Sequence, residues 1–399
     1  MRTIYITDYQ RTPYGKYAGA LSHIRPDDLA AMVIKSIAER NPTIDPASVD
    51  DVILGCANQA GEDNRNIGRF AALLAGLPIN VPGTTVNRLC ASGMQSVMDA
   101  TARIQAGMDN LILAGGVESM SRAPYVLPKS QKGFDRSVEL YDTTLGWRFI
   151  NKAFEAVYKT YSMGETAENI AERWSWSREQ QDHFALQSHQ KYIQATQKSV
   201  FRDELIILKS ATGMLIETDE AARKDTSMEK LRALKPAFRQ GGSVTAGNAS
   251  GLNDGAAAML IASEESIKKH DLKPLARIVS FAVAGVHPDI MGTGPILAVQ
   301  KLLAKTGLQL KDIDLFEINE AYAVQVIHCI KELAINPEIV NVNGGAIAIG
   351  HPLGSSGTRI TGHLALELIR RNKRYGIATM CVGVGQGTAI LIENINQTI

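Results

Sequence analysis

Cys90 lies in the segment 87–93 (NRLCASG), between a short strand expected over 81–86 and a helix expected over 94–105. The helix is predicted because this stretch is rich in good helix formers and repeats apolar residues at helical spacing. At such a junction, unpaired backbone N–H groups and the helix dipole favour a thiolate. Cys90 is therefore a candidate nucleophile, although a lone cysteine is more often a buried core residue.

Two glycine-rich segments near the C-terminus add a histidine and a second cysteine. His351 follows a glycine and precedes a proline in the segment 343–357 (NGGAIAIGHPLGSSG), a pattern typical of a tight turn that ends a strand and opens a helix. We expect its imidazole at the start of that helix, exposed to a cleft. Cys381 ends an expected buried strand, and the glycines that follow, beginning with Gly383, leave backbone N–H groups free to bind an oxyanion. Two cysteines and a histidine at glycine-lined strand ends are together a specific signal of thiol chemistry.

Seven segments resemble the motifs of the thiolase family and follow that family's order along the chain. They extend from the N-terminal region to the C-terminal one, so the resemblance covers nearly the whole sequence. The segments are 11–15 (RTPYG), 87–93 (NRLCASG), 115–120 (GGVESM), 245–251 (TAGNASG), 319–322 (NEAY), 350–354 (GHPLG) and 381–387 (CVGVGQG). By this resemblance the sequence is identified as a member of the family.

The resemblance implies an acyl-CoA C-acyltransferase that cleaves a 3-oxoacyl-CoA with free coenzyme A, or runs the reverse condensation, through an acyl-Cys90 intermediate. His351 would take the thiol proton, and Cys381 would protonate the departing acetyl-CoA enolate. Asn319 would fix a water that holds the enolate oxygen together with His351, although capping of a helix is an alternative role for this residue. The backbone N–H groups of Cys90 and Gly383 would receive the tetrahedral oxyanion. Coenzyme A is then a substrate, and neither a cofactor nor a metal ion is expected.

Four further residues match family positions that contact coenzyme A. Ser250 matches the serine beside the pantetheine arm, and Ala246 belongs to the same segment. Arg223 matches the arginine beside the adenine and phosphates, where a planar guanidinium can stack and bind phosphate. Met163 matches a pocket methionine. These matches predict a coenzyme A site that extends across the region 121–242.

Several pocket-rim segments bear on the acyl group. Ser162 stands where the biosynthetic acetoacetyl-CoA thiolases carry histidine, and Val384 where many thiolases carry glycine. Together with the segments 55–64 and 146–149, these residues look most like thiolases acting on 3-oxoadipyl-CoA in aromatic degradation. An acetyl-CoA C-acetyltransferase that makes acetoacetyl-CoA is the alternative. Arg148 is the most suggestive partner for a substrate carboxylate, whereas a solvated helix face or a subunit contact would be a bland role for it.

Two other functions share this ancestry. A decarboxylating ketosynthase should carry a second catalytic histidine where this chain has Cys381. A non-catalytic acyl-CoA or lipid carrier is expected to have lost Cys90, His351 or Cys381, yet all three are present. Both alternatives are therefore disfavoured.

The elements that must position these residues alternate between short apolar strands and helical stretches, which is typical of an α/β protein with a largely parallel sheet. A faint repeat relates the two halves, because the pattern at 85–93 is echoed at 341–357. The alternation stops between 121 and 242, where Ser177 can cap a helix. Strands are expected at 52–55, 110–114, 257–262, 276–281, 315–318 and 377–380.

The resemblance implies the thiolase fold, with two similar α/β domains in a layered αβαβα arrangement and an inserted loop domain. The N-terminal domain would comprise residues 1–120 and 243–270, and the C-terminal domain residues 271–399. The loop domain at 121–242 would cover coenzyme A and carry contacts of a homotetramer, built as a dimer of dimers.

Composition excludes several other classes. The 399 residues carry 42 basic and 41 acidic side chains, so nucleic-acid binding has no electrostatic support. No apolar run is long enough to span a bilayer, and the N-terminus enters a strand without a targeting pattern. The four cysteines lack CxxC spacing, so neither a disulfide framework nor a zinc site is indicated, and we expect Cys56 and Cys329 in the core. A reduced cytoplasm suits a thiol that must stay free.

Overall fold

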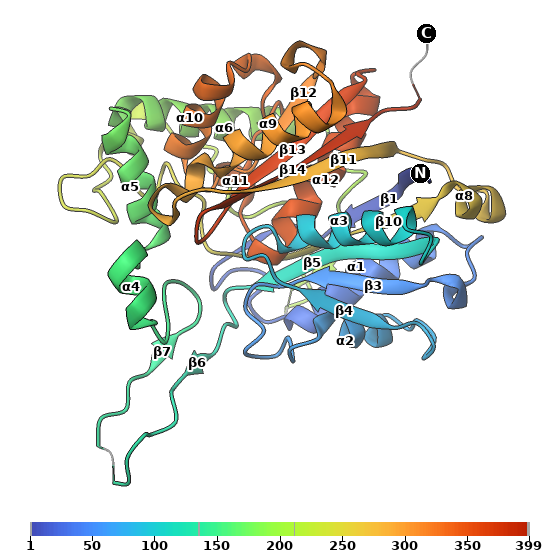
Figure 1. Cartoon of the computed structure of the whole chain (residues 1–399), viewed down its shortest axis with the longest axis horizontal. Helices are drawn as coiled ribbons and strands as arrows, with labels where there is room; N and C mark the ends of the chain where they lie inside the picture. The colour runs from blue at the N-terminus through green and yellow to red at the C-terminus, as the bar shows by residue number, and fades with distance from the viewer. Residues whose placement is uncertain (1, 135, 211, 397–399) are drawn as a thin grey trace.

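The computed structural model describes residues 2–134, 136–210 and 212–396. Figure 1 shows a layered molecule, in which helices α3 and α12 lie between two half-sheets and further helices cover the outer faces. Among the described residues, no helix combines the length and the apolar character needed to cross a bilayer. The expected αβαβα layering is therefore confirmed.

The first half-sheet has the strand order β4-β3-β5-β10-β1. Strand β3 runs parallel to β4 and β5, whereas β10 runs antiparallel to β5 and β1. The strands are β1 (Ile4–Arg11), β2 (Gly15–Lys16, paired with β10), β3 (Asp51–Gly55), β4 (Gly83–Val86), β5 (Leu111–Ser119) and β10 (Asn253–Ser263), and the helices are α1 (Pro26–Arg40), η1 (Pro46–Ser48), α2 (Ile67–Leu74), α3 (Ser92–Gln105) and α8 (Glu264–His270).

The second half-sheet has the order β12-β13-β14-β11, with β12 and β13 parallel and the other neighbours antiparallel. Val340 forms a parallel bridge to Phe316 on the outer side of β12, which is the place of β4 in the first half. Both halves therefore share one strand order and one set of directions. The strands are β11 (Ala276–Gly285), β12 (Leu315–Ile318), β13 (Tyr375–Val382) and β14 (Gln386–Glu393), and the helices are η2 (Pro288–Thr293), α9 (Gly294–Thr306), η3 (Leu310–Asp312), α10 (Ala323–Leu333), η4 (Pro337–Ile339), α11 (Ala346–Ile349) and α12 (Leu353–Arg370).

All six strands expected from the sequence are present, but the expectation of a largely parallel sheet is wrong. Strands β13 and β14 are joined by a short turn at 383–385, and such a turn forces antiparallel pairing. Strand β10 is also antiparallel to both of its neighbours, after the long excursion that separates it from β5. The sheet is therefore mixed in both halves.

The inserted region is fastened to the core by buried ion pairs. Arg11, at the end of β1, donates to Glu204 at 2.7 Å and to Asp219 at 2.6 Å, and all three side chains are fully buried or nearly so. Breaking one partner of such a pair leaves a buried charge uncompensated. The region contains β6 (Tyr125–Val126), β7 (Tyr141–Asp142), α4 (Lys152–Tyr158), α5 (Met163–Arg173), α6 (Arg178–Gln197), β8 (Leu208–Lys209), β9 (Leu215–Ile216) and α7 (Met228–Arg232), and Ser177 caps α6 as predicted.

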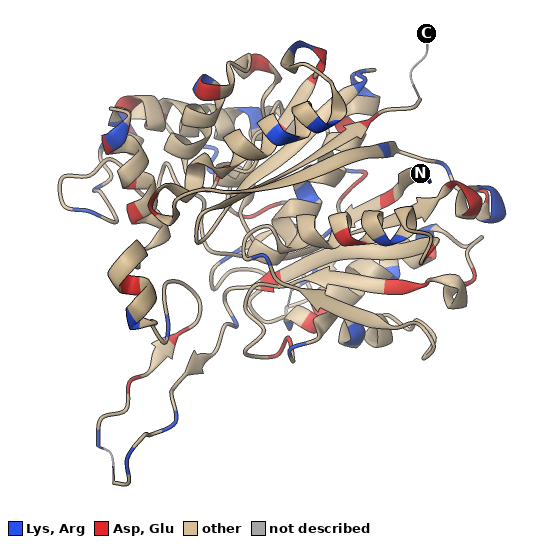
Figure 2. Cartoon of the chain, viewed as in Figure 1, with Lys and Arg blue, Asp and Glu red and all other residues tan. Residues whose placement is uncertain are grey.

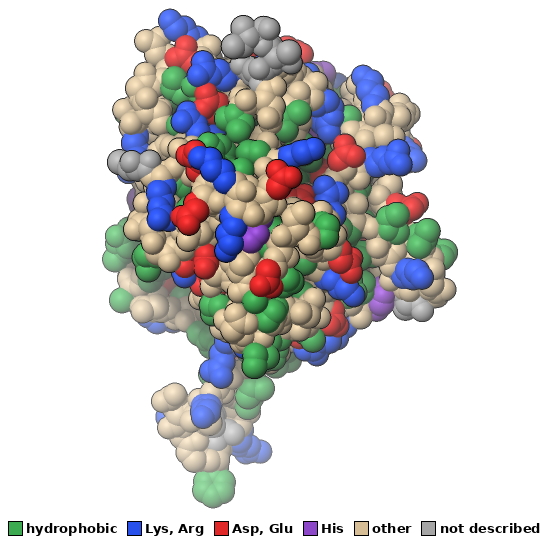
Figure 3. Space-filling model, turned by 90° about the vertical axis from the view of Figure 1, so that its right-hand side faces the viewer, with side chains coloured by type: hydrophobic (Ala, Val, Ile, Leu, Met, Phe, Trp, Pro, Cys, Tyr) green, Lys and Arg blue, Asp and Glu red, His purple; other side chains and the backbone are tan. Residues whose placement is uncertain are grey.

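One part of this region, which we call the arm (residues 124–134 and 136–142), projects from the body and carries β6 and β7. Figure 3 shows it as a narrow extension below the rest of the molecule. Its apolar side chains are exposed, with Leu127 at 58 %, Phe134 at 104 % and Val138 at 65 % of full exposure. Apolar side chains exposed in such number are uncommon on a monomeric protein.

Charged residues of both signs are distributed over the chain. Figure 2 shows lysine and arginine interspersed with aspartate and glutamate, and neither sign gathers on one side in that view. This distribution agrees with the net charge of +1. In the view of Figure 2 the protein shows no basic face of the kind that nucleic-acid-binding proteins present.

Helices α3 and α12 start at nearly the same point, because glycines there let backbones touch. A Cβ atom on Gly116 of β5 would lie 1.9 Å from the carbonyl oxygen of Gly354, and one on Gly93 would lie 2.4 Å from the same oxygen. Distances this short require glycine at both positions. The segments that carry Cys90 and His351 therefore meet in the middle layer.

Candidate active site

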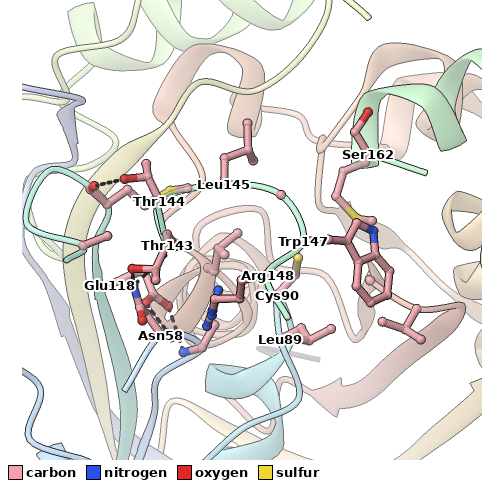
Figure 4. Close-up of a pocket in the computed structure, with 18 of the residues that line it drawn as sticks. Asn58, Leu89, Cys90, Glu118, Thr143, Thr144, Leu145, Trp147, Arg148 and Ser162 are labelled. Carbon is pink, nitrogen blue, oxygen red and sulfur yellow. Dashed lines mark hydrogen bonds between the residues drawn. The ribbon is translucent and has the colours of Figure 1, made fainter. Parts of the chain in front are cut away.

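A cavity of about 300 Å³ opens beside the start of α3. Figure 4 shows Glu118, Asn58 and Thr143 on one side of it and Trp147 and Ser162 on the other. The residues singled out in the sequence that line this cavity are Cys90, Met163, Gly383, Arg148, Ser162 and Val384.

Cys90 lies between β4 and α3, at the strand-to-helix junction predicted for it. The side chain is half-buried, and burial raises the pKa of the Cys90 thiol to about 11. The backbone N–H groups of Gly383 and of Cys90 itself act in the opposite direction, because they hydrogen-bond the sulfur. The backbone contribution expected at this junction is present, but the cost of burying the charge is larger, so the net shift of the thiol pKa is upward.

Two non-glycine residues with left-handed backbone flank this sulfur. Leu89 has φ 47° and Val384 has φ 63°. The Leu89 side chain lies close over Gly383, since a Cβ atom there would be 3.1 Å from Leu89 Cδ1. A left-handed β-branched residue is strained, and strain of this kind is found at functional sites. The turn that presents the Gly383 N–H is thus held by tertiary contacts.

Cys381 is the penultimate residue of β13 and is 1 % exposed. It packs with Met291 and Ala321, and Met163 and Tyr322 lie against the same cluster. Burial raises the pKa of the Cys381 thiol well above its usual value, and the charge of Cys90 raises it further. The structure therefore brings the two thiols close enough to influence each other, with Cys381 protonated at neutral pH.

His351 precedes α12, as predicted, but its expected exposure to a cleft is wrong, because the side chain is 5 % exposed. Its backbone N–H donates to Asn253 Oδ1 at 2.9 Å, and its ring nitrogens contact Ser356 Oγ at 2.6 Å and Asn319 Nδ2 at 3.4 Å. Burial and then the charge of Arg359 lower the pKa of the imidazole to about 3. His351 is therefore neutral near pH 7.

Asn319 follows β12, and its side chain turns toward His351. The alternative that it caps a helix is wrong, because α10 begins at Ala323 with Tyr322 at its N-cap position. The Asn319 Oδ1 atom is buried and has no partner among the described residues. This amide is available to a further hydrogen-bonding group beside the imidazole.

Glu118 holds the start of α12 against the cavity wall. Its carboxylate accepts the backbone N–H groups of Ala57 at 3.0 Å, Asn58 at 3.1 Å and Gly354 at 2.9 Å. Burial raises the pKa of this carboxyl to about 7. Sequence reasoning quoted the segment that contains Glu118 without giving this residue a role, and its place directly before a strand end was the available signal.

A second cavity, of about 380 Å³, is lined by Arg223 and Ala246. Ser250 stands between two of its lining residues and donates to the carbonyl oxygen of Ala321 at 3.3 Å. Because Ala321 packs against Cys381, Ser250 lies between the second cavity and the thiols. Met163 lines the first cavity instead. The four residues expected to contact coenzyme A therefore lie along a path from the second cavity to the first.

Arg148 is half-buried at the wall of the first cavity and has no hydrogen-bond or ion-pair partner among the residues that the structure describes. Trp147, which sequence reasoning did not assign, donates its indole N–H to Tyr161 O at 2.9 Å and so anchors this loop. Ser162 caps α5 through a capping box with Glu165, which explains a serine at this position. The cavity thus combines apolar walls with one unpaired cation.

Comparison with known proteins agrees with this site. Residues 4–265 match the family model "Thiolase, N-terminal domain" and residues 272–394 match "Thiolase, C-terminal domain". The chain is 51 % identical to the 3-oxoadipyl-CoA/3-oxo-5,6-dehydrosuberyl-CoA thiolase of Escherichia coli K12, covering 99 % of this chain and 100 % of the relative. It is 49 % identical to the β-ketoadipyl-CoA thiolase of Pseudomonas putida over the same shares.

Solved structures give the same result. The Bacillus anthracis acetyl-CoA acetyltransferase matches with a TM-score of 0.93 and 43 % identity, covering 99 % of each chain. The human mitochondrial 3-ketoacyl-CoA thiolase in complex with CoA matches with a TM-score of 0.92 and 40 % identity, covering 98 % of each chain.

The chain belongs to the thiolase family. It is an acyltransferase, and coenzyme A-dependent thiolytic cleavage or the reverse condensation is its reaction. The non-catalytic carrier and the decarboxylating ketosynthase considered from the sequence are therefore excluded.

Proposed function

We propose that this thiolase acts on a 3-oxoacyl-CoA whose acyl chain ends in a carboxylate, of the 3-oxoadipyl-CoA class. The observation that carries the proposal is the unpaired Arg148 at the wall of the cavity that contains Cys90. Relatives named for β-ketoadipyl-CoA, identical to this chain at 49–51 %, support it. The alternative is an acetyl-CoA C-acetyltransferase, and the substrate comparison below distinguishes the two.

The first half of the proposed reaction acylates Cys90. At neutral pH the thiol is protonated and His351 is neutral, and in the proposed step the proton passes from sulfur to imidazole while the sulfur attacks the β-carbonyl. The N–H groups of Cys90 and Gly383, which already hydrogen-bond the sulfur, are placed to bind the oxyanion that forms. In other enzymes, removal of one such donor raises the barrier by about 3–4 kcal/mol.

The second half concerns the acetyl-CoA enolate. Cys381 is a buried, protonated thiol and can deliver its proton to the α carbon. Asn319 and His351 lie together at the enolate side, where the free lone pairs of Asn319 Oδ1 can hold a water. The proton held by His351 then passes to the Cys381 thiolate, which restores both groups. Free coenzyme A attacks the thioester on Cys90, His351 takes the proton of its thiol, and the same proton returns to the Cys90 sulfur as that sulfur leaves.

Coenzyme A is proposed to extend from the second cavity, beside Arg223 and Ala246, past Ser250 to Met163 and the thiols. This path uses Arg223 and Met163 of the region 121–242, the proposed loop domain, and Ala246 and Ser250 of the segment 243–270. The nucleotide end of coenzyme A would then lie in the second cavity and the acyl group in the first. The proposed domains 1–120 with 243–270 and 271–399 then supply the nucleophile and the acid–base groups respectively.

Arg148 can distinguish a carboxylate-terminated acyl group from a methyl-terminated one, because its guanidinium has no acidic partner among the described residues. An apolar wall would strip water from a terminal carboxylate at a cost of several kcal/mol unless a donor met it. A guanidinium meets a carboxylate with two hydrogen bonds. A methyl-terminated acyl group gains nothing from the same side chain.

We expect Arg148→Met to depress kcat/KM for 3-oxoadipyl-CoA by roughly tenfold or more while sparing acetoacetyl-CoA, because a lost charge-assisted hydrogen bond costs about 1.5–3 kcal/mol. The measurement compares kcat/KM for the two substrates on wild type, Arg148→Met and the control Arg136→Met, in which an exposed arginine of the arm is replaced. Equal losses on both substrates would indicate a structural role, and unchanged values on both would remove Arg148 from substrate binding.

We propose that the protein assembles as a homotetramer. Helix α2 exposes Phe70 and Leu73, and the connection from α2 to the edge strand β4 exposes Ile79, which suits pairing of two copies edge to edge. The exposed apolar side chains of the arm suit contacts between such dimers.

Replacing arm residues 128–139 by a short glycine-serine linker is expected to give a stable dimer where the wild-type protein is a tetramer. Sedimentation equilibrium at several micromolar concentrations measures both. A tetramer that persists without these residues would show that the arm does not carry the contact, and a wild-type monomer would overturn the assembly altogether.

A reducing compartment, as in the cytoplasm, is also proposed. All four cysteines are free, and Cys56, Cys329 and Cys381 are buried. A nucleophilic thiol must remain reduced to accept an acyl group.

A further inference from the structure

Ser356 contacts the imidazole of His351 from the side opposite to Asn319. Its Oγ lies 2.6 Å from His351 Nδ1 and 2.8 Å from the carbonyl oxygen of Pro352. Ser356 is fully buried in the first turn of α12, five residues after the histidine. The sequence shows it within the segment 343–357, where a serine in the first turn of a helix draws no attention.

The hydroxyl of Ser356 sets the order of protons along this hydrogen-bond chain. A hydroxyl has one hydrogen, and Ser356 donates it to the carbonyl oxygen of Pro352, which also accepts the backbone N–H of Ser356. Ser356 Oγ then accepts from His351 Nδ1, which must carry the ring hydrogen. On the other side, Asn319 Nδ2 faces His351 Nε2 as a donor at 3.4 Å, in agreement with a lone pair on that nitrogen.

We propose that Ser356 is a positioning residue, which fixes His351 as the Nδ1–H tautomer and keeps the Nε2 lone pair available to receive a proton. The inference rests on the proposed function, in which His351 is the base for the Cys90 thiol. Without Ser356, the buried Nδ1–H would lose its acceptor, and the ring could exchange its hydrogen to Nε2 or rotate. Either change removes the proton acceptor from the reacting side.

The neighbouring serine provides a matched control. Ser355 is also fully buried in the first turn of α12, and its Oγ pairs with the hydroxyl of Tyr14 rather than with the imidazole. Ser355→Ala therefore removes a buried hydroxyl from the same turn without touching His351. Ser356→Thr retains a hydroxyl and serves as the conservative variant.

The direct test is the tautomer itself. Long-range proton–nitrogen correlation spectra of protein labelled at the histidine ring nitrogens report which nitrogen carries the hydrogen, and a His351→Asn spectrum identifies the signal. We expect Nδ1–H in wild type and in Ser355→Ala, and a shift toward Nε2–H or a tautomer mixture in Ser356→Ala. A wild-type Nε2–H tautomer would overturn the proposal, even if Ser356→Ala does not fold.

The kinetic test is the single-turnover rate at which acetyl-CoA acylates Cys90. We expect Ser356→Ala to lower this rate by at least about tenfold, part of the roughly 10²–10⁴-fold that a positioned proton acceptor contributes, while KM for acetyl-CoA stays unchanged. Ser356→Thr should restore most of the rate. Equal losses in Ser355→Ala and Ser356→Ala would mean that the turn, and not the tautomer, matters.

Failure of this inference is distinguishable from failure of the proposed function. His351→Asn is measured in the same acylation assay. If it acylates at the wild-type rate, His351 is not the base, whatever the tautomer. If His351→Asn is slow but Ser356→Ala is as fast as wild type, the base assignment holds and the role of Ser356 is wrong.

Discussion

Cys90→Ser protein is expected to gain no acetyl group from acetyl-CoA, whereas wild type gains one. A serine hydroxyl is a far weaker nucleophile than a thiol, and the site offers it the same neutral imidazole as its base. We expect thiolysis to fall by on the order of 10⁴–10⁶-fold, as when nucleophiles of other covalent enzymes are removed. Intact-mass measurement after incubation with acetyl-CoA, together with the rate of acetoacetyl-CoA cleavage, checks this result.

Cys56→Ser is the control for this change. Cys56 is also a buried thiol, and it lies 3.6 Å from Asp63 Oδ2, a carboxylate that a serine hydroxyl can meet equally well. We expect this variant to take up the acetyl group as wild type does. An adduct that persists on Cys90→Ser would remove Cys90 from the role of nucleophile.

The raised pKa of Cys90 adds a pH dependence to the same experiment. With a pKa of about 11, the thiolate fraction grows as the pH rises toward that value. Alkylation of Cys90 by iodoacetamide in the free enzyme should then accelerate by about tenfold per pH unit between pH 7 and 10. A rate that is already constant above pH 7 would show a resting thiolate, and the thiol would then not need His351 for its activation.

Cys381→Ser is expected to separate the two halves of the reaction. The acyl-enzyme should still form, because Cys90, Gly383 and His351 are unchanged. Exchange of the α protons of acetyl-CoA in heavy water should stop, since a serine hydroxyl at this buried position cannot exchange protons with carbon at a useful rate. Proton NMR of acetyl-CoA in heavy water follows the exchange, and we expect a loss of roughly 10²–10⁴-fold, the usual contribution of a positioned acid–base group.

Cys329→Ser provides the matched variant for this second experiment. Cys329 is another buried thiol with a raised pKa, and its sulfur lies 3.4 Å from the carbonyl oxygen of Gly292 in the core beneath α10. It should exchange protons at the wild-type rate. Wild-type exchange in Cys381→Ser would contradict the acid–base role, and loss of acylation as well would show that the change disturbs the whole site.

The strands could be predicted because their signals are local. The run at 315–318 coincides with β12, and the run at 377–380 lies within β13, since both are largely apolar stretches of strand length. Strand direction could not be predicted in the same way. The antiparallel placement of β10 depends on where the chain returns after about 130 residues of intervening sequence, which no local pattern records.

The candidate site shows the same division between local and distant causes. Motif positions at strand ends correctly predicted that Cys90, Cys381 and Gly383 come together. The state of these groups depends on distant residues. His351 is covered by Asn253, 98 residues earlier in the chain, and the pKa of Cys90 follows burial by the second half of the protein. The position of a residue at the start of a helix predicts neither the burial of His351 nor the burial of Cys90.

The strained turn at Val384 and the exposed arm also lie beyond local reasoning. A valine between glycines predicts a flexible turn or a strand end, and its left-handed backbone is set by the packing of β13 and β14 against the α3 segment. The exposed apolar side chains of the arm are not packed within one chain. In the proposed tetramer they would pack against another subunit.

The two half-sheets share two paired residue positions, Tyr5 with Arg277 and Ile6 with Ala276, and the proposed catalytic groups are divided between them. Cys90 belongs to the first half, and His351 and Cys381 belong to the second. A chain that has completed one half during refolding therefore has ordered secondary structure but no competent thiol. Recovery of acetyl uptake by Cys90 would therefore report when the two halves dock. The delay between recovery of secondary structure and recovery of acetyl uptake would measure the duration of that last folding step.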